Sequence, residues 1–284
     1  MSGELAAVSG ILERVWPGGV DTVERLGGGI TNHNFKVVVG GEAFVLRVGG
    51  AATELLGIDR RVEYAVSLVA ADLGLGPAVV AFVEPEGHVV TRFVAGEVGR
   101  VDPAGVAALL RRFHGSPPIP GHFDAFRVVE DYAAKVQAWG APLPAGYARA
   151  HAVARRIEAR LGQRPLVPCH NDLLAANFIA GDDRIWIVDW EYAGMGDPAF
   201  DLANFAVSNR LDPAGDAELL AAYGTDDART HTLMRFMSDF REAMWGVLQH
   251  ALSELDFDFA AYADEHFERL EQTAAEPRFR AALG

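Results

Sequence analysis

The first third of the chain alternates hydrophobic and polar positions in short segments, and this period of two predicts β-strands. Turn residues separate the segments: Gly40-Gly41 divides the first pair, and Glu84-Pro85-Glu86-Gly87 divides the second. Two longer segments repeat their apolar positions every three to four residues, which predicts helices. The predicted strands span 34–39, 42–48, 78–83 and 88–94, and the predicted helices span 4–16 and 58–73.

From about residue 97 onward the helical period dominates. Asp102 suits the N-cap of the first of these helices, and Pro103 suits its first helical position. The only strand signals in this part are Asn177–Ala180 and Arg184–Val188. The predicted helices span 102–114, 128–139, 147–161, 199–208 and about 228–254.

Together the two patterns predict an α+β fold with two lobes. Residues 1–94 would form a small antiparallel sheet lobe with one main helix, and residues 95–284 would form a larger helical lobe. The segment 91–97 is the expected hinge between them. Because ligands commonly bind in clefts between such lobes, we expect the functional site there.

Composition restricts the partners of the protein. The 284 residues carry a formal net charge of −14, which repels nucleic acid and anionic membranes. The charge is compatible with a cationic substrate, and the alternative is that it serves solubility. A single cysteine, Cys169, fits a reducing compartment. The N-terminus lacks a signal-peptide pattern, and no apolar run is long enough to span a bilayer. We therefore expect a cytoplasmic protein without membrane insertion and without a nucleic-acid partner; no feature specifies its oligomeric state.

The strongest chemical signal is His170-Asn171-Asp172, with Asn177 five residues after the aspartate and Asp189 at the end of the next strand. Phosphoryl transfer to a hydroxyl needs a base for the attacking oxygen and hard oxygen ligands for magnesium. Asp172 is placed to be the base, and the hairpin 177–189 would bring Asp189 beside Asn177 as the two metal ligands. Each residue alone is commonly a turn or cap residue, so the indication comes from their joint spacing.

The segments 170–177 and 188–192 resemble motifs of the aminoglycoside phosphotransferase and choline kinase superfamily, and 194–202 is similar to the segment that follows in those families. The resemblance extends over about residues 20–270. It implies a two-lobed protein-kinase-like fold and an enzyme that uses ATP and Mg²⁺. Asp201 is expected to have a structural role, tying the helix 199–208 to the catalytic loop.

The N-terminal part adds residues that the resemblance assigns to nucleotide binding. The loop with Gly28, Gly29, Thr31 and Asn32 is similar to the nucleotide loop of choline kinases, and glycines let backbone amides approach phosphates closely. Seen alone, this loop is also compatible with a plain hairpin turn.

Arg47 occupies the strand position where kinases place a phosphate-binding lysine, and its guanidinium suits bidentate phosphate contacts. Glu63, on the following helix, is its expected partner. The alternative is that Arg47 and Glu63 form a structural surface pair. The backbone of the hinge 91–97 would meet the adenine.

The acceptor side is expected to hold a small cationic molecule, most simply a choline-like amino alcohol. A quaternary ammonium group has no hydrogen-bond donor and is held by aromatic faces and nearby negative charge. The candidates are Tyr192, Trp245 and Tyr262 for the faces and Glu191 for the charge. The alternative for each aromatic residue is a place in the hydrophobic core.

The segments 243–249 and 255–258 look like the corresponding region of bacterial choline and ethanolamine kinases. The predicted function is therefore ATP-dependent phosphorylation of choline or ethanolamine. Two alternatives remain: a kinase for another alcohol, such as an aminoglycoside or thiamine, and a catalytically silent kinase fold that only binds. Retention of the predicted base and both metal ligands counts against the silent fold.

Overall fold

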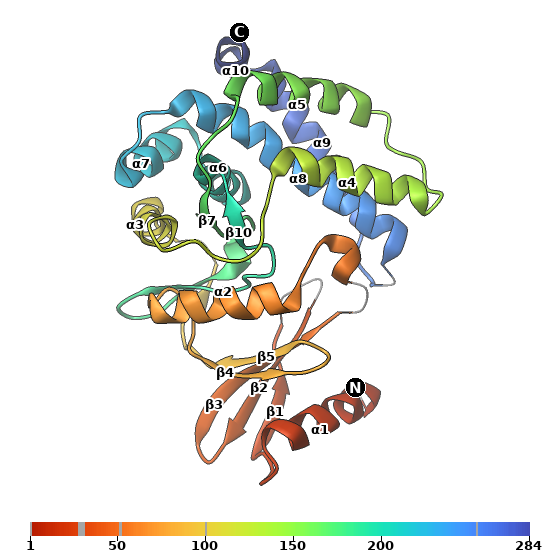
Figure 1. Ribbon diagram of the computed structural model, residues 1–284, viewed down its shortest axis with the longest axis vertical. Coiled ribbons are helices and arrows are strands. Elements are labelled where there is room, and N and C mark those ends of the chain that lie inside the picture. The colour runs from red at the N-terminus through yellow and green to blue at the C-terminus, as the bar shows by residue number, and fades with distance from the viewer. Residues whose placement is uncertain (1, 28–31, 51–52, 100, 254) are drawn as a thin grey trace.

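The structure, a computed structural model, describes residues 2–27, 32–50, 53–99, 101–253 and 255–284. An antiparallel sheet lies at one end and most of the helices at the other, with the two chain termini at opposite ends (Figure 1). The helices are α1 (Ser2–Val15), α2 (Arg60–Asp72), α3 (Pro103–His114), α4 (Ala125–Ala138), α5 (Tyr147–Leu161), α6 (Pro198–Ser208), α7 (Pro213–Tyr223), α8 (Ala228–Leu252), α9 (Phe259–Ala275) and α10 (Pro277–Leu283), with 3₁₀ turns η1 (Thr53–Leu56) and η2 (Ala175–Asn177). The strands are β1 (Thr22–Arg25), β2 (Asn32–Val39), β3 (Glu42–Gly49), β4 (Val79–Val83), β5 (His88–Arg92), β6 (Glu97–Val98), β7 (Val167–Cys169), β8 (Phe178–Ala180), β9 (Ile185–Ile187) and β10 (Gly194–Gly196).

The five-stranded sheet has the order β1-β2-β3-β5-β4, and every neighbouring pair is antiparallel. Gly40 and Gly41 join β2 to β3 with φ values of 59° and 83°, a conformation that glycine adopts without steric cost. This tight turn fixes the register, so Arg47 on β3 lies opposite Asn34 on β2 and Val89 on β5. Arg47 is therefore held on a central strand, on the part of the sheet that leads to the helices.

Helix α2 lies between the sheet and the helical part of the molecule (Figure 1). Asp59 caps it by accepting hydrogen bonds from the backbone N–H groups of Arg61 and Val62. Val66 and Ala70 are fully buried on its apolar face. The same helix also buries Glu63, a charged side chain that needs a partner to be stable there.

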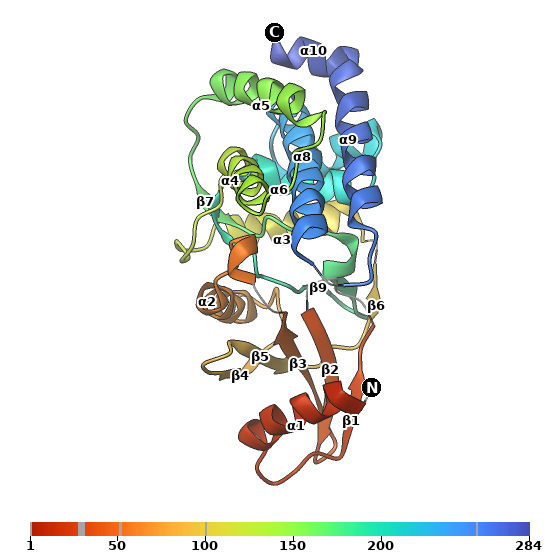
Figure 2. The same ribbon diagram turned by 90° about the vertical axis from the view of Figure 1, so that its right-hand side faces the viewer.

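Helix α8 forms the centre of the helical part, with α4, α6 and α9 packed around it (Figure 2). Its apolar stripe is buried almost completely and includes Leu233, Phe236, Met237 and Phe240. A helix surrounded by other helices hides its polar residues as well, and most of the α8 residues from 230 to 249 are buried. The polar side chains of this helix must therefore find partners inside the protein.

The prediction that only two strand segments follow the hinge is wrong. Strands β6, β7 and β10 also form: β7 pairs with β10, and β6 pairs with β8. Each has only two or three residues, too few for an alternating pattern, and each exists because a distant segment supplies its hydrogen bonds. Gly96 precedes β6 where a Cβ atom would lie 2.5 Å from the carbonyl oxygen of Ala180, so only glycine fits.

The other predicted elements are confirmed within a few residues, and Asp102 caps α3 by accepting from the backbone N–H of Gly105 at 2.7 Å. Helices α7, α9 and α10 were not among the predictions. The α+β class with a small antiparallel sheet and a larger helical part is confirmed, whereas the boundary at residue 94 stays a prediction. Among the described residues, no helix combines the length and apolarity needed to cross a membrane.

Candidate functional site

A cavity of about 480 Å³ lies between the sheet and the helical part, and residues from both line it. Phe93 and Val94 of the expected hinge line it, and so do Asp172 and Asp189. Two groups of polar residues meet there. We call the group Arg47, Arg60, Glu63, Asp189 and Glu191 the β3 end, and the group Asp172, Tyr192, Arg241, Glu242, Trp245 and Tyr262 the α8 end.

Asp172 belongs to the loop after β7 and is buried. The side-chain amide of Asn177 donates to the backbone carbonyl of Asp172 at 2.8 Å and to its Oδ2 at 3.3 Å. The residue before it, Asn171, has a φ of 65°, as does Asp189 at 68°, so both lie in the left-handed region that non-glycine residues seldom adopt. Such a backbone conformation persists only where neighbouring groups hold the loop in place.

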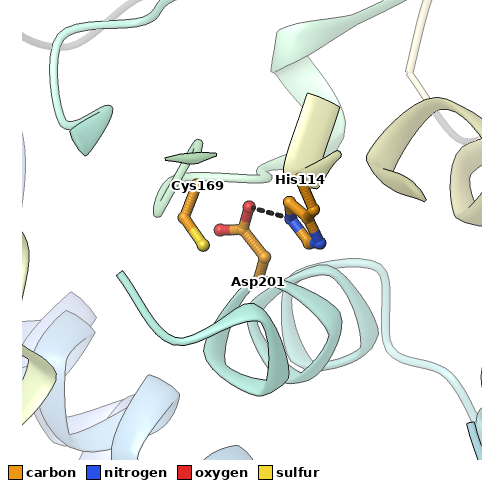
Figure 3. Close-up of side chains that lie close together, drawn as sticks. All are labelled: His114, Cys169 and Asp201. Atoms are coloured by element: carbon orange, nitrogen blue, oxygen red, sulfur yellow. Dashed lines mark hydrogen bonds and ion pairs between the residues drawn. The ribbon is translucent and has the colours of Figure 1, made fainter. Parts of the chain in front are cut away.

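Asp201 on α6 supplies that hold. Its two carboxylate oxygens accept hydrogen bonds from the consecutive backbone N–H groups of His170 and Asn171 at 2.7 and 2.6 Å. The prediction that Asp201 ties this helix to the loop is confirmed. Figure 3 shows His114 pointing at the same carboxylate, and Cys169 lying beside it.

His114, Cys169 and Asp201 form the one group of potential metal ligands found among the residues the structure describes. Both nitrogens of His114 already have partners, the Asp201 carboxylate at 3.1 Å and the Tyr223 hydroxyl at 2.8 Å. Burial raises the pKa of the Cys169 thiol well above its ordinary value, so the sulfur is a neutral packing group. This cluster therefore braces the catalytic loop and does not offer an open metal site.

The carboxylate of Asp172 also contacts helix α8. Nη1 of Arg241 lies 3.0 Å from Asp172 Oδ1 and 2.6 Å from Oε1 of Glu242. Burial raises the pKa of Asp172 to about 7, although the Arg241 guanidinium opposes this rise. A carboxylate with a pKa near neutrality, placed in a cavity, has the properties of a general base.

At the β3 end, Arg47 lies among three carboxylates. Its Nη2 atom contacts Oε2 of Glu191 at 2.9 Å and a carboxylate oxygen of Asp189, and its Nε lies 3.4 Å from Glu63. Burial alone would lower the pKa of Arg47, but Asp189, Glu63 and Glu191 together raise it. The expected pairing of Arg47 with Glu63 is present, and it is buried, which contradicts the alternative of a surface pair.

A second arginine, Arg60, completes the β3 end from the start of α2. Its Nη1 contacts Glu63 at 2.6 Å and Glu191 at 3.1 Å, and its Nη2 donates to the side-chain oxygen of Asn32 at 3.0 Å. Asn32 in turn donates to Glu191 at 3.0 Å. The network places Asn32 beside the β3 end. Gly28, Gly29 and Thr31 of the same predicted loop lie outside the described residues.

The predicted metal ligands Asn177 and Asp189 both line the cavity. The pair supplies an amide and a carboxylate, the oxygen ligands that magnesium prefers. The short β8–β9 hairpin holds the two segments together, because the backbone N–H of Val188 donates to the carbonyl of Asn177 at 3.0 Å; the role of Asn177 and Asp189 as metal ligands stays a prediction. Their chemistry therefore fits a magnesium site shared with phosphate oxygens.

The four predicted substrate residues do not all lie together. Tyr192, Trp245 and Tyr262 meet at the α8 end: the Trp245 indole donates to the Tyr192 hydroxyl at 3.1 Å, and the Trp245 and Tyr262 rings pack edge to face with centroids 5.5 Å apart. All three line the cavity, and Tyr192 and Trp245 also belong to the hydrophobic core. Glu191 lies instead at the β3 end, where Arg47 and Arg60 bind its carboxylate.

Three charges of the site were missed from the sequence: Arg241 and Glu242, which line the cavity, and Arg60, which contacts Glu63 and Glu191 beside it. Arg241 and Glu242 interrupt the apolar face of a helix that is otherwise buried, and their exposed fractions are 1% and 2%. A charged pair inside an apolar helical stripe was the available signal, since such residues are buried only when paired. Arg60 carried no comparable signal. It stands beside a second arginine, Arg61, which is exposed, and the sequence alone does not distinguish the two.

Comparisons with known proteins agree with this geometry. The sequence profile described as "Phosphotransferase enzyme family" matches residues 22–237. Protein LicA of Haemophilus influenzae is 29% identical over 220 residues, which cover 72% of this chain and 63% of LicA. Ethanolamine kinase 2 of Rattus norvegicus is 33% identical over 124 residues, covering 35% of this chain and 32% of the rat protein.

Among solved structures, the crystal structure of a choline/ethanolamine kinase family protein from Mesorhizobium loti superimposes with a TM-score of 0.85 at 31% identity, covering 99% of this chain and 97% of that one. The agreement extends through the sheet, the catalytic loop and the helical part, and it confirms the predicted kinase-like fold. The chain spans less than two thirds of the Haemophilus relative, so the comparison with that protein concerns the shared region. The profile match over most of the chain and the close structural agreement lead to the same assignment: this chain is a choline/ethanolamine kinase-like member of the phosphotransferase enzyme family.

Proposed function

We propose that this chain transfers the γ-phosphoryl group of ATP to the hydroxyl group of choline or ethanolamine. The observation that carries the proposal is that Asp172 lines one cavity together with the predicted metal ligands Asn177 and Asp189 and with three aromatic residues of the α8 end. The assignments of ethanolamine kinase 2 and of the Mesorhizobium loti protein support the choice of acceptor.

In this proposal the β3 end, except Glu191, acts on the nucleotide together with Asn177. Arg47, held by Glu63, binds phosphate oxygens, and Asn177 and Asp189 hold magnesium. The metal, when bound, neutralises charge on the phosphates. The predicted loop with Gly28, Gly29, Thr31 and Asn32 is assigned to phosphate binding, and the hinge at Phe93 and Val94 is assigned to the adenine.

At the α8 end, Asp172 accepts the proton of the acceptor hydroxyl and orients its oxygen toward the γ-phosphate. Trp245 and Tyr262, with Tyr192, form the wall for the cationic head, and Glu191 contributes negative charge from the neighbouring β3 end. The proposed setting is the cytoplasm, where ATP and magnesium are available, and the acceptor is a small molecule rather than a nucleic acid.

A coupled assay of ADP release with choline, ethanolamine, thiamine and an aminoglycoside as acceptors tests the proposal. We expect magnesium-dependent turnover with choline or ethanolamine and little with thiamine or the aminoglycoside. Efficient turnover with only one of the latter two would assign a different alcohol. Absence of turnover with every acceptor, in a protein that still binds ATP, would favour the silent binding fold.

A further inference from the structure

The α8 end holds a carboxylate that the proposed chemistry does not use. Glu242 lines the cavity, although only 2% of its surface is exposed. Burial by itself would raise the pKa of Glu242, but the guanidinium of Arg241 outweighs burial and holds the pKa below its ordinary value. Glu242 is therefore an anion inside the pocket that we propose for the acceptor.

This anion retains capacity for more hydrogen bonds. Oε1 accepts from Arg241 at 2.6 Å, and Oε2 accepts from the Tyr262 hydroxyl at 2.8 Å. A carboxylate offers about four lone-pair positions, so roughly two remain beyond these partners. Groups that can use them are N–H or O–H donors that enter the cavity.

Charge at the α8 end points the same way. Two carboxylates, Asp172 and Glu242, converge on a single nitrogen, Nη1 of Arg241. These three side chains together carry an excess negative charge when both carboxylates are ionised. A ligand with one positive charge would balance it, and burial makes the attraction stronger than it would be at the surface.

One of the three aromatic faces is already covered. The guanidinium carbon of Arg241 lies 4.3 Å from the centroid of the Tyr192 ring, within cation–π distance. The edge-to-face contact between Trp245 and Tyr262 uses part of another ring. A quaternary ammonium group would therefore find fewer free aromatic faces in this pocket than the residues of the pocket indicate. An ammonium group with N–H bonds would find a buried carboxylate that can accept them.

We propose that Glu242 is the specificity-determining residue of this site: it accepts hydrogen bonds from an ammonium group that carries N–H, so the enzyme prefers primary amino alcohols to trimethylated ones. This inference rests on the function proposed above and makes it narrower. Each methyl group added to the nitrogen removes one donor, and the third removes the last. The preference should decline along the series rather than appear at a single step.

The test measures kcat/KM for ethanolamine, N-methylethanolamine, N,N-dimethylethanolamine and choline with the wild-type protein and with Glu242→Gln. We expect the wild-type value to fall along the series, with ethanolamine above choline by roughly tenfold to a hundredfold, the range that corresponds to a charge-assisted hydrogen bond. Glu242→Gln should lose most of its activity on ethanolamine and less on choline, so that the ratio approaches one. Because the ratio compares acceptors on one protein, a change in Asp172 common to all acceptors cancels.

Asp239→Asn is the matched control. Asp239 is a buried carboxylate on the same helix, and its partners are His266 and Arg269 on α9. It does not belong to the residues that line the cavity, so its substitution should lower stability without changing the acceptor ratio. If Glu242→Gln fails to fold, inhibition of the wild-type protein by methylammonium and tetramethylammonium replaces it, and methylammonium should be the stronger inhibitor.

Three results would overturn the inference. The first is a wild-type preference for choline, and the second is a ratio that Glu242→Gln leaves unchanged; in either case the kinase function itself stands. The third is absence of turnover with all four amino alcohols, which would overturn the proposed function together with the role of Glu242.

Discussion

The two ends of the cavity both bury carboxylates against arginine, and they differ in where the partners come from. At the β3 end, Glu63, Asp189 and Glu191 are paired with Arg47 and Arg60, and these five residues come from three separate parts of the chain. At the α8 end, Asp172 and Glu242 share one partner, Arg241, which is adjacent to Glu242 on a single helix. Counted over these described residues, each end has one more carboxylate than arginine.

This difference separates the functions that we propose for the two ends. A network gathered from several elements fixes their relative positions, which suits the shared task of holding phosphates. A pair on one helix can be altered by a substitution at one position without changing the rest of the site. Such a pair is suited to determining which acceptor the site binds. Removing the last partner of a buried charge leaves that charge without compensation, so such a substitution should have a large effect.

The largest effect is expected from a substitution of Asp172, the proposed general base at the α8 end. Asp172→Asn should lower turnover by about 10²–10⁴-fold, the usual contribution of positioned acid–base catalysis. ATP affinity measured by calorimetry should change little, because the base acts on the acceptor. Turnover close to that of the wild type would show that Asp172 is not the base.

The next effect breaks the β3 end. Asp189→Ala should weaken binding of ATP in the presence of magnesium by about 100-fold or more, since even partners of metal ligands contribute 10–100-fold to metal affinity. Binding without magnesium, measured by the same titration, should change much less. Equal losses with and without magnesium would assign Asp189 to Arg47 alone and not to the metal.

A smaller effect tests the aromatic wall. Trp245→Leu keeps apolar volume but removes the π face, whose contact with a desolvated cation contributes up to about 2 kcal/mol. The KM for choline should rise by roughly 30-fold, with turnover and the KM for ATP little changed. Normal choline kinetics in this variant would place Trp245 in the core only.

The smallest effect compares two adjacent arginines. Arg60 is buried in the β3 end, and Arg61 forms an exposed pair with Glu84 at 3.0 Å. Arg60→Ala should raise the KM for ATP several-fold, because it loosens the carboxylates that hold Arg47; a net hydrogen bond contributes about 0.5–1.5 kcal/mol. Arg61→Ala should stay within about twofold, as expected for a surface ion pair. Similar effects of both variants on the KM for ATP would show that Arg60 contributes no more to the site than the surface residue Arg61.

The sequence predicted the proposed base and metal ligands better than the charges on α8, for a physical reason. Asp172, Asn177 and Asp189 are close in the chain, so their spacing alone indicates that they meet. Arg241 and Glu242 lie about 70 residues further on, and the helical pattern around them describes only which face is buried. Their contact with Asp172 depends on how α8 crosses the catalytic loop, which local patterns do not specify.

The fold shows the same limit. Strands β2 and β3 were predictable because their alternation and the Gly40-Gly41 turn are local. Strands β7 and β10 depend on each other across more than 20 residues, so neither has a signal of its own. Helix α9 has a regular apolar period that includes Phe259, Ala263 and Phe267. It was not predicted because the aromatic residues at its start were interpreted as pocket residues.

Strand β6 has a consequence for how this protein can be recombined with its relatives. The segment after the sheet does not swing freely: Glu97 and Val98 pair with Ala180 and Ile179 of the hairpin that carries Asn177. Gly96 approaches that hairpin so closely that a single added methyl group would collide with the carbonyl oxygen of Ala180. The sheet and helical parts are thus joined by a hydrogen-bonded seam in addition to the covalent chain. A chimera that exchanges either part for that of a relative would have to carry residues 96–98 and 178–180 from the same parent.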